Sequence, residues 1–447
     1  MAWAGARRSV APGRAAQRWL HVDRDLSTYA FPFGSVRDIS GPVLTLLRHA
    51  RLPGAGQEAD RLVDLVVADE RIVHVADGGT LALPAWAAPG EVHDLAGRWV
   101  APGLVDLHAH LTGGGGESGF ATRVPRLMIA ELARAGVTSV VGLLGTDGVT
   151  RTTRDLVATA YGLREEGLSA WCYTGSYAVP PPTLTGSVKD DIVFVEPILG
   201  VGELALSDHR SSQPTLDELL RVASDAYVAG LTAKKAGLVH LHMGDGARGL
   251  DLVRRALDVA EIPARVWHPT HLNRNPRLWA EAKELARQAR RLPWFDVTAF
   301  PTDDLDGALS AAAAAADWVA SGLPPDRLTV SSDAGGCLPT FDADGHLVRM
   351  GVGAAETLLE TVAALVREHG WRLGDALALV TAQPARAAML PRKGAIAAGA
   401  DADLVVLEDP STGVTAPHAV MARGVWLVED GRTTGRGRGV FDREDAR

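Results

Sequence analysis

The residues best suited to metal chemistry in this sequence are histidines at the ends of strand-like runs. In residues 105–110, VDLHAH, His108 and His110 are two positions apart. Residues i and i+2 of a strand point to the same face, so both imidazoles can face one metal ion. The pair ends an apolar run and precedes the glycine-rich stretch 113–117, which favours a metal site over two ordinary strand histidines.

Three further candidate ligands follow other strand-like runs. His242 closes one such run, His271 ends the stretch WHPTH, and Asp333 follows the run LTVSS. Imidazoles and carboxylates are the protein ligands that zinc accepts when thiolates are absent. His240 and His268 occur in the same stretches, and we expect them to be core histidines or to support the ligands.

The elements that would position these ligands alternate between strands and helices from residue 103 to residue 392. Strand-like runs such as 136–142 and 327–332 are interspersed with amphipathic stretches such as 215–229 and 276–291. Strands that alternate with helices predict parallel βα units, and hence an α/β fold. About 290 residues of such units suit a (β/α)8 TIM-like barrel, whose active site lies at the carboxyl ends of its strands. The candidate ligands would then converge at one rim.

Both ends of the chain differ from this middle part. Short alternating runs bounded by Gly, Asp or Pro occupy residues 41–102 and return in residues 393–447. In the second segment, 403–407 and 420–428 are each predicted as a strand, and 429–431 as a turn. The pattern predicts one small β-sandwich domain built from both termini.

The composition excludes several classes of protein. Hydrophobic residues make up 47% of the 447 residues and charged residues 22%, which indicates a sizeable core rather than disorder. The 45 basic and 54 acidic residues give a net charge of −9, so neither a nucleic acid nor a membrane surface is an expected partner. No apolar run of about 18 residues suggests a membrane span.

Two features bear on the location of the protein. The two cysteines, Cys172 and Cys337, are too few for a disulfide framework, so a reducing cytoplasm is the expected compartment. Residues 1–40 are rich in arginine but lack the apolar core of a secretory signal. We expect them to form an N-terminal extension of unknown role.

Longer motifs resemble those of the amidohydrolase superfamily. The stretch 102–110, PGLVDLHAH, with a later His, His and Asp, is similar to the superfamily as a whole. The resemblance to one branch, the isoaspartyl (β-aspartyl) dipeptidases, extends from about residue 43 to the C-terminus. The matching stretches are 113–117, 136–147, 185–188, 207–210, 242–245, 269–271, 273–275 and 356–362.

This resemblance implies a zinc-dependent hydrolase with two metal ions per chain. His108, His110 and Asp333 would hold the first zinc, and His242 and His271 the second. A hydroxide between the two ions would attack the scissile amide, its pKa lowered by the metals. Asp333 would take the proton and deliver it to the leaving amine.

The resemblance also assigns residues to the substrate. Tyr177 matches a family tyrosine that polarises the carbonyl and stabilises the oxyanion. Arg210 and Arg274 match arginines that bind substrate carboxylates, a task suited to a guanidinium group. Glu117 matches the residue that pairs with the substrate ammonium, and Thr146 matches a further contact. Taken singly, each has a plainer alternative as a surface or packing residue.

The most informative departure from the family is Glu203. The family bridges its metals with a carboxylated lysine at this position, and glutamate is shorter by about three bonds, or roughly 4 Å. Both groups carry one negative charge and two oxygens, so Glu203 can bridge two zinc ions without carbon dioxide if the backbone comes closer. The alternative is that Glu203 replaces a lost ligand and one metal site is weak. Other lysines that could carry a carbamate are Lys189, Lys234 and Lys235, none at the matching position.

A second departure is Cys337, where the family usually has a serine facing the substrate carboxylate. A thiol is a weaker hydrogen-bond donor than a hydroxyl, so substrate preference can differ. We expect Cys337 to be a small buried residue rather than a nucleophile.

The interpretation that accounts for most of these features is a zinc-dependent dipeptidase that cleaves β-aspartyl dipeptides. The family resemblance also suggests that the protein forms a homo-oligomer. Two alternatives stay open. One is a related amidohydrolase acting on a cyclic amide or an N-acyl amino acid. The other is a non-catalytic relative with an impaired metal site, against which the retained histidines and Asp333 argue.

Overall fold

The computed structural model describes residues 44–79, 81–83, 90–300, 307–341, 347–413 and 415–440. The extension expected at residues 1–40 lies outside these ranges. Within them no helix is both long enough and apolar enough to cross a membrane.

Eight parallel strands form a TIM-like barrel in the middle of the chain. Strands β6 to β11 make one sheet in sequential order, and β12 pairs with β13. The N–H of Trp294 donates to the carbonyl of Trp267 (3.0 Å), and that of Asp333 to the carbonyl of His108 (3.1 Å), so the two sheets join at both edges. The strands are β6 Leu104–Ala109, β7 Val137–Gly142, β8 Ser169–Thr174, β9 Ile198–Leu206, β10 Leu238–Met243, β11 Trp267–Thr270, β12 Phe295–Thr298 and β13 Leu328–Ser331.

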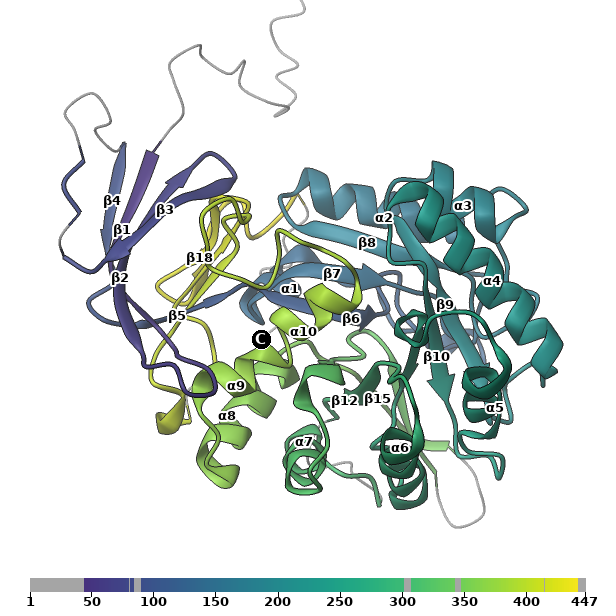
Figure 1. Cartoon of the computed structure of the whole chain (residues 1–447). Coiled ribbons are helices and arrows are strands. Elements are labelled where there is room, and N and C mark those ends of the chain that lie inside the picture. Colours follow the sequence, from purple (N-terminus) through teal and green to yellow (C-terminus); the bar gives the residue numbers. More distant parts are fainter. Residues whose placement is uncertain are drawn as a thin grey trace, which may run out of the picture. The chain divides into compact units, whose positions relative to one another are not determined.

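Helices follow the barrel strands and cover them from outside, as Figure 1 shows for α2, α3 and α4. They are α1 Ile129–Arg134, α2 Thr153–Glu165, α3 Val188–Phe194, α4 Leu216–Ala233, α5 Asp251–Val259, α6 Pro276–Gln288, α7 Ala311–Ala320, α8 Thr357–His369, α9 Leu373–Ala378 and α10 Ala382–Ala387. The helices predicted at 215–229 and 276–291 are confirmed as α4 and α6.

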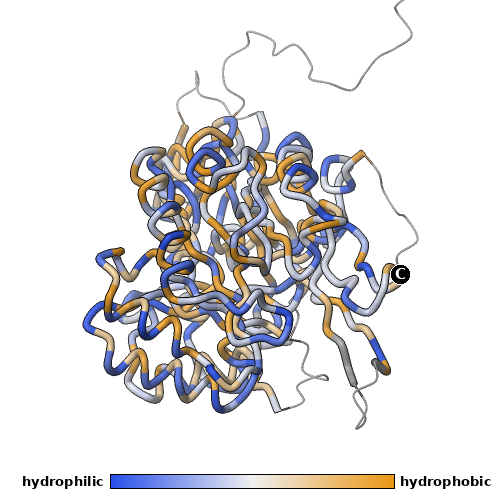
Figure 2. The backbone as a smooth tube through the Cα atoms, turned by 90° about the vertical axis from the view of Figure 1, so that its right-hand side faces the viewer, coloured by the Kyte–Doolittle hydropathy of each residue, from blue (hydrophilic) through white to orange (hydrophobic). Residues whose placement is uncertain are grey.

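Capping residues explain where α4 begins and ends. The hydroxyl of Thr215 accepts from the N–H of Glu218, whose carboxylate accepts from the N–H of Thr215, which is a capping box. Lys234 ends the helix in a left-handed conformation, beyond the predicted limit at 229. In Figure 2 hydrophobic and hydrophilic residues alternate along the outer helical turns, as expected of helices that bury one face.

The barrel core consists of strands buried on both sides. Every residue of β9 and of β10 is buried, as expected of parallel strands between a barrel interior and a helix layer. Trp267 and Trp318 are fully buried in this core. Replacing one of them with alanine would cost about 3–5 kcal/mol of stability. Such packing leaves little freedom at the strand ends that carry the candidate ligands.

Strands from both ends of the described chain form a single nine-stranded sheet, shown in purple, blue and yellow in Figure 1. The two halves join where β5 pairs antiparallel with β16. The strands are β1 Leu44–Leu52, β2 Arg61–Ala68, β3 Arg71–Asp77, β4 Glu91–Asp94, β5 Trp99–Pro102, β16 Leu404–Leu407, β17 Ala419–Ala422, β18 Val425–Glu429 and β19 Arg432–Thr433.

The prediction of one strand over 420–428 is wrong in one respect. A turn at Arg423 and Gly424 divides this stretch into β17 and β18, and both residues have positive φ angles, 48° and 77°. Two such residues match the right-handed twist of a tight antiparallel hairpin. A Cβ at Gly424 would lie 1.8 Å from the carbonyl oxygen of Asp69, so this position requires glycine. The turn predicted at 429–431 is confirmed between β18 and β19.

Candidate metal centre

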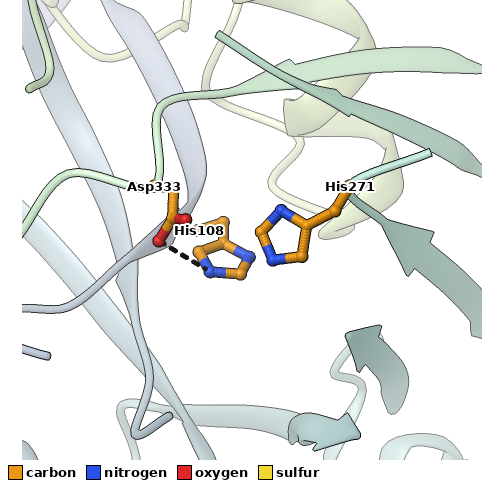
Figure 3. Close-up of side chains that lie close together, drawn as sticks. All are labelled: His108, His271 and Asp333. Carbon is orange, nitrogen blue, oxygen red and sulfur yellow. Dashed lines mark ion pairs between the residues drawn. The ribbon is translucent and has the colours of Figure 1, made fainter. Parts of the chain in front are cut away.

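Four imidazoles and two carboxylates meet at the carboxyl ends of the barrel strands. They come from β6 (His108 and the following His110), β9 (Glu203), β10 (His242) and the residues that follow β11 (His271) and β13 (Asp333). Figure 3 shows His108, His271 and Asp333 converging from separate strands. All six residues are buried.

The first cluster contains His108, His110, Glu203 and Asp333. Oδ1 of Asp333 lies 3.3 Å from Nε2 of His108 and 3.2 Å from Nε2 of His110. Oε1 of Glu203 lies 3.5 Å from Nε2 of His110. Two imidazole nitrogens and two carboxylate oxygens therefore face a common point, as in a zinc site without thiolates.

The second cluster shares Glu203 with the first. Its Oε2 lies 3.2 Å from Nδ1 of His242 and 3.6 Å from Nε2 of His271. The candidate ligand atoms of Glu203, His242 and His271 all lie within 4.8 Å of one another. Oε1 faces His110, whereas Oε2 faces His242 and His271 and also lies 3.6 Å from Nε2 of His108. Glu203 therefore lies between two sites that could each hold a metal ion.

Glu203 reaches this position through an irregularity in its strand. Between Val239 and Leu241 of β10 the register shifts, so that Gly202 and Glu203 of β9 both lie opposite His240. An extra residue of this kind bulges a strand and turns a side chain in a new direction. A Cβ at Gly202 would lie 2.7 Å from the Cβ of His240, so glycine is what allows the two strands to approach here.

Two of the candidate ligand residues have backbone conformations that are uncommon in residues other than glycine. His271 has a φ of 60° and Asp333 a φ of 53°. Left-handed conformations at bulky residues cost of order 1–3 kcal/mol and cluster at functional sites. The strained backbone directs both side chains toward the interior of the rim.

Electrostatics at the site favour a positive charge between the carboxylates. Burial opposes the charged form of His108, but the carboxylates of Glu203 and Asp333 outweigh it and raise the pKa of this imidazole to about 9. Burial likewise opposes the charged form of Glu203, yet the charge of His108 and hydrogen bonds from His242 and His271 hold its pKa well below the usual range. A divalent cation would satisfy the same negative potential.

The nitrogens that face away from the clusters are tied to other groups. Nε2 of His242 lies 3.0 Å from Oδ2 of Asp208, and Nδ1 of His271 lies 2.7 Å from the hydroxyl of Thr298. Nδ1 of His108 lies 2.8 Å from Nε2 of His240. Such partners fix the tautomer and orientation of a ligating imidazole.

Tyr177 lies beside the second cluster. Its hydroxyl is 2.9 Å from Nδ1 of His242, and its ring lies under the guanidinium of Arg210, 5.3 Å from ring centre to carbon. Burial, together with the negative charge of Glu203, raises the pKa of Tyr177 well above its ordinary value. The phenol therefore stays protonated and can donate a hydrogen bond.

Arg210 and Glu117, both assigned to the substrate from the sequence, are ion-paired. Nη1 of Arg210 lies 3.2 Å from Oε1 of Glu117, and its Nε and Nη2 donate to the two carboxylate oxygens of Asp208. The thiol of Cys337, partly exposed rather than fully buried, donates to Oε1 of Glu117 at 3.0 Å. A charged pair thus lies next to the second cluster, with Nη2 of Arg210 3.5 Å from Nε2 of His242.

Two other predicted substrate residues lie at the same rim. Nη1 of Arg274 donates to the carbonyl of Met243 at 3.0 Å and lies 3.4 Å from Nε2 of His242. Thr146 is half-buried and follows Gly145, where a Cβ would lie 2.8 Å from Cε1 of His110. Both positions lie next to groups that contact the ligands.

The lysines considered as carbamate carriers are engaged elsewhere. Nζ of Lys235 donates to the carbonyls of Ile192, Val195 and Ile198, and Lys189 pairs with Asp225 at 2.9 Å. Lys234 caps the end of α4. The position that matches the family lysine is occupied by Glu203, which belongs to two of the groups that could hold a metal ion.

Sequence reasoning missed several residues that support the ligands. Asp208 lies within a matched motif but had no assigned role, although it orients both His242 and Arg210. His240 and His268 were expected to be core or supporting residues, and both are fully buried. Asp296 also lies in the barrel interior, where burial raises its pKa to about 6. The sequence signal that could have identified these supporting residues is a polar residue within an otherwise apolar strand.

Residues 99–427, which include every metal ligand described above, match the model of the Amidohydrolase family. The chain belongs to the amidohydrolase family. It is therefore a hydrolase of a family whose members generally bind metal, and its own clusters could hold one.

Solved structures show how far this amidohydrolase resembles others. It is similar to the β-aspartyl dipeptidase of Fervidobacterium islandicum AW-1 in complex with β-Asp-Leu, with 37% identity, a TM-score of 0.79, and coverage of 88% of this chain and 99% of that chain. A dihydropyrimidinase from Brevibacillus agri NCHU1002 has 16% identity and a TM-score of 0.61, covering 88% of this chain and 97% of that chain. The second likeness shows the fold alone.

Curated relatives match a shorter part of this amidohydrolase. The imidazolonepropionase of Burkholderia ambifaria is 38% identical over 130 residues, 28% of this chain and 32% of that protein. An imidazolonepropionase of Methylobacterium sp. (strain 4-46) is 36% identical over 127 residues, 27% of this chain and 30% of that protein. The chain spans about a third of the length of the curated relatives it matches.

Proposed function

We propose that this amidohydrolase binds two zinc ions and hydrolyses the β-aspartyl (isoaspartyl) amide bond of dipeptides. The observation that carries the proposal is Glu203, whose carboxylate lies between two groups of histidines, His108 and His110 on one side and His242 and His271 on the other. The 37% identity to a β-aspartyl dipeptidase over 99% of that chain supports the choice of substrate.

The donor set fits two zinc ions. Nε2 of His108 and Oδ1 of Asp333 are buried and have no hydrogen-bond partner within the described ranges, as expected of atoms that serve as ligands. His108, His110 and Asp333 would hold one ion, and His242 and His271 the other, with Glu203 shared. When bound, the ions supply Lewis acidity that lowers the pKa of water and polarises the amide carbonyl.

Asp333 is the group that moves the proton. Burial disfavours its charged form, but His108 and His110 outweigh burial and hold the pKa of Asp333 below its usual range. The group is therefore a carboxylate at neutral pH and can accept a proton from the attacking water. The same carboxylate can deliver that proton to the nitrogen of the leaving amine.

Tyr177 and the charged rim orient the dipeptide. The protonated phenol, 2.9 Å from His242, can donate to the carbonyl oxygen as negative charge develops there. The guanidinium groups of Arg210 and Arg274 suit the substrate carboxylates, and Glu117 suits the free ammonium. The substrate would satisfy the charges that Arg210 and Glu117 now satisfy in each other.

The test compares β-Asp-Leu with α-Asp-Leu on the purified, zinc-quantified chain, with a hydantoin as a cyclic amide. We expect the β-linked dipeptide to be favoured in kcat/KM by at least about 100-fold, because the rim is arranged for one placement of ammonium and carboxylate. Arg274→Ala should raise KM for β-Asp-Leu, whereas Arg290→Ala, on the exposed surface, should not. Equal rates on the two dipeptides, or turnover of the hydantoin alone, would refute the proposed substrate.

A further inference from the structure

A continuous chain of hydrogen bonds runs from a metal ligand into the barrel interior. Nδ1 of His108 lies 2.8 Å from Nε2 of His240, and Nδ1 of His240 lies 2.7 Å from Nδ1 of His268. Nε2 of His268 lies 3.0 Å from the hydroxyl of Thr329, which donates to Oδ1 of Asp296 at 2.5 Å. We call His240, His268, Thr329 and Asp296 the buried histidine chain.

Each member of the buried histidine chain is fully buried and comes from a different strand, in the order β10, β11, β13 and β12. Burying a polar group is unfavourable unless it is hydrogen-bonded, and a barrel interior can be filled with aliphatic side chains without that cost. A chain of four such groups in sequence is therefore more than packing requires.

Metal ligation by Nε2 of His108 would set the direction of every bond in the buried histidine chain. For Nε2 of His108 to bind a cation, its proton must sit on Nδ1 and point at His240. A neutral His240 then carries its proton on Nδ1 and donates it to His268. His268 in turn donates from Nε2 to the hydroxyl of Thr329, which donates to Asp296.

The far end of the buried histidine chain is a hydrogen-bond acceptor, the carboxylate of Asp296. Besides the hydroxyl of Thr329, the carboxylate of Asp296 accepts from the hydroxyls of Thr270 and Ser331, both at 2.6 Å. At the near end, the ring of Tyr173 stacks on that of His240 with centroids 4.9 Å apart and planes 6° apart. The chain is thus held in one orientation at both ends.

We propose that the buried histidine chain is a positioning device that holds His108 in the tautomer with a free Nε2, and so sets the affinity of the first metal site. The inference rests on the proposed metal-binding function but not on the substrate. If His268 offers no acceptor, the proton of His240 moves to Nε2 and faces His108. His108 must then carry its own proton on Nε2, where it competes with the metal.

The test is metal affinity of the whole chain, measured by competition of the metal-free protein with a chromophoric zinc chelator. His268→Phe keeps a ring of similar size but removes the acceptor, and we expect about 10–100-fold weaker binding of the first Zn²⁺. His268→Asn places an amide oxygen close to the position of Nδ1 and should recover most of the affinity. The visible spectrum of the Co²⁺-loaded protein should change in His268→Phe and return toward wild type in His268→Asn.

The matched control is Tyr173→Phe. Its hydroxyl has no hydrogen-bond partner among the residues described, so the variant keeps the stack on His240 and should bind zinc as wild type does. Thermal unfolding of each metal-free variant identifies any that fails to fold. If His268→Phe does not fold, Asp296→Asn tests the far end of the chain by the same readouts.

The outcomes separate this inference from the proposed function. A folded His268→Phe with wild-type zinc affinity and an unchanged Co²⁺ spectrum would overturn the positioning role while leaving the dipeptidase intact. A wild-type chain that binds zinc but cleaves no β-aspartyl dipeptide would overturn the substrate alone. A wild-type chain that binds no divalent metal would overturn both.

Discussion

Replacing Glu203 with glutamine tests whether one carboxylate serves two metal ions. The change keeps the shape of the side chain and removes one negative charge. The carboxylate oxygens of Glu203 lie 3.2–3.6 Å from nitrogens of all four ligating histidines. A cation held by those nitrogens would lie close to the carboxylate, and we take a separation of about 4 Å to estimate their interaction.

The magnitude of the effect follows from that separation. Two unit charges 4 Å apart interact by about 4 kcal/mol at an effective dielectric constant of about 20. Each metal ion should therefore lose at least about 4 kcal/mol of binding free energy in Glu203→Gln, or about three orders of magnitude in affinity. Both ions should be affected, because the carboxylate lies between the two clusters.

The assay is zinc content after equilibration at a fixed free zinc concentration, together with kcat on β-Asp-Leu. We expect two zinc ions per wild-type chain and fewer than one in Glu203→Gln, with loss of activity. Glu165→Gln, the same chemical change on the exposed face of α2, should keep both ions. The hypothesis of a shared carboxylate would be wrong if Glu203→Gln retained two ions at wild-type affinity. It would also be wrong if the wild-type chain held one ion and the substitution did not change that number.

Three more predictions concern single side chains at the rim. Tyr177→Phe should lower kcat by about 10²–10³-fold with little change in KM, and a kcat within tenfold of wild type would contradict this role. Because the pKa of Tyr177 is raised, the wild-type enzyme should not lose activity through ionisation of this tyrosine up to about pH 10. Glu117→Gln should raise KM for β-Asp-Leu by about 10–100-fold, because one charge-assisted hydrogen bond to the substrate ammonium is lost. An unchanged KM would show that Glu117 does not bind the ammonium. The pKa of His108 is raised to about 9 in the metal-free protein, so below that pH a second proton occupies Nε2 in addition to the one on Nδ1, and zinc must displace it. Zinc affinity should therefore rise about tenfold per pH unit and level off near pH 9. A chelator competition series that is flat with pH would contradict ligation by His108.

The convergence of the candidate metal ligands could be predicted from the sequence because two regularities act together. A strand alternates its side chains, so His108 and His110 share a face. Parallel βα units place every carboxyl strand end on one rim, so His242, His271 and Asp333 reach the same place despite their distance along the chain. Neither argument needs knowledge of how the strands are registered against each other.

The position of Glu203 depends on register, which is why the sequence left it open. The shift between β9 and β10 sets Gly202 and Glu203 opposite a single residue, His240. Strand register is fixed by packing against neighbours on both sides, and no local pattern encodes a shift of one residue. The hairpin turn at Arg423 was missed for a related reason, since its left-handed backbone is imposed by the strands that flank it.

The orientation of the candidate ligand side chains is harder still to predict from the sequence. His242 and His271 are tied through their outward nitrogens to Asp208 and Thr298, each on a different segment from its histidine. His110 is the exception, because its Nδ1 has no hydrogen-bond partner in the described part of the chain, and its ring instead packs against Gly145, where a Cβ would approach within 2.8 Å. An imidazole fixed by hydrogen bonds has a defined tautomer, whereas one fixed by close packing has only a defined plane. No hydrogen bond in the described part of the chain therefore sets the tautomer of His110, and a bound metal ion would select it.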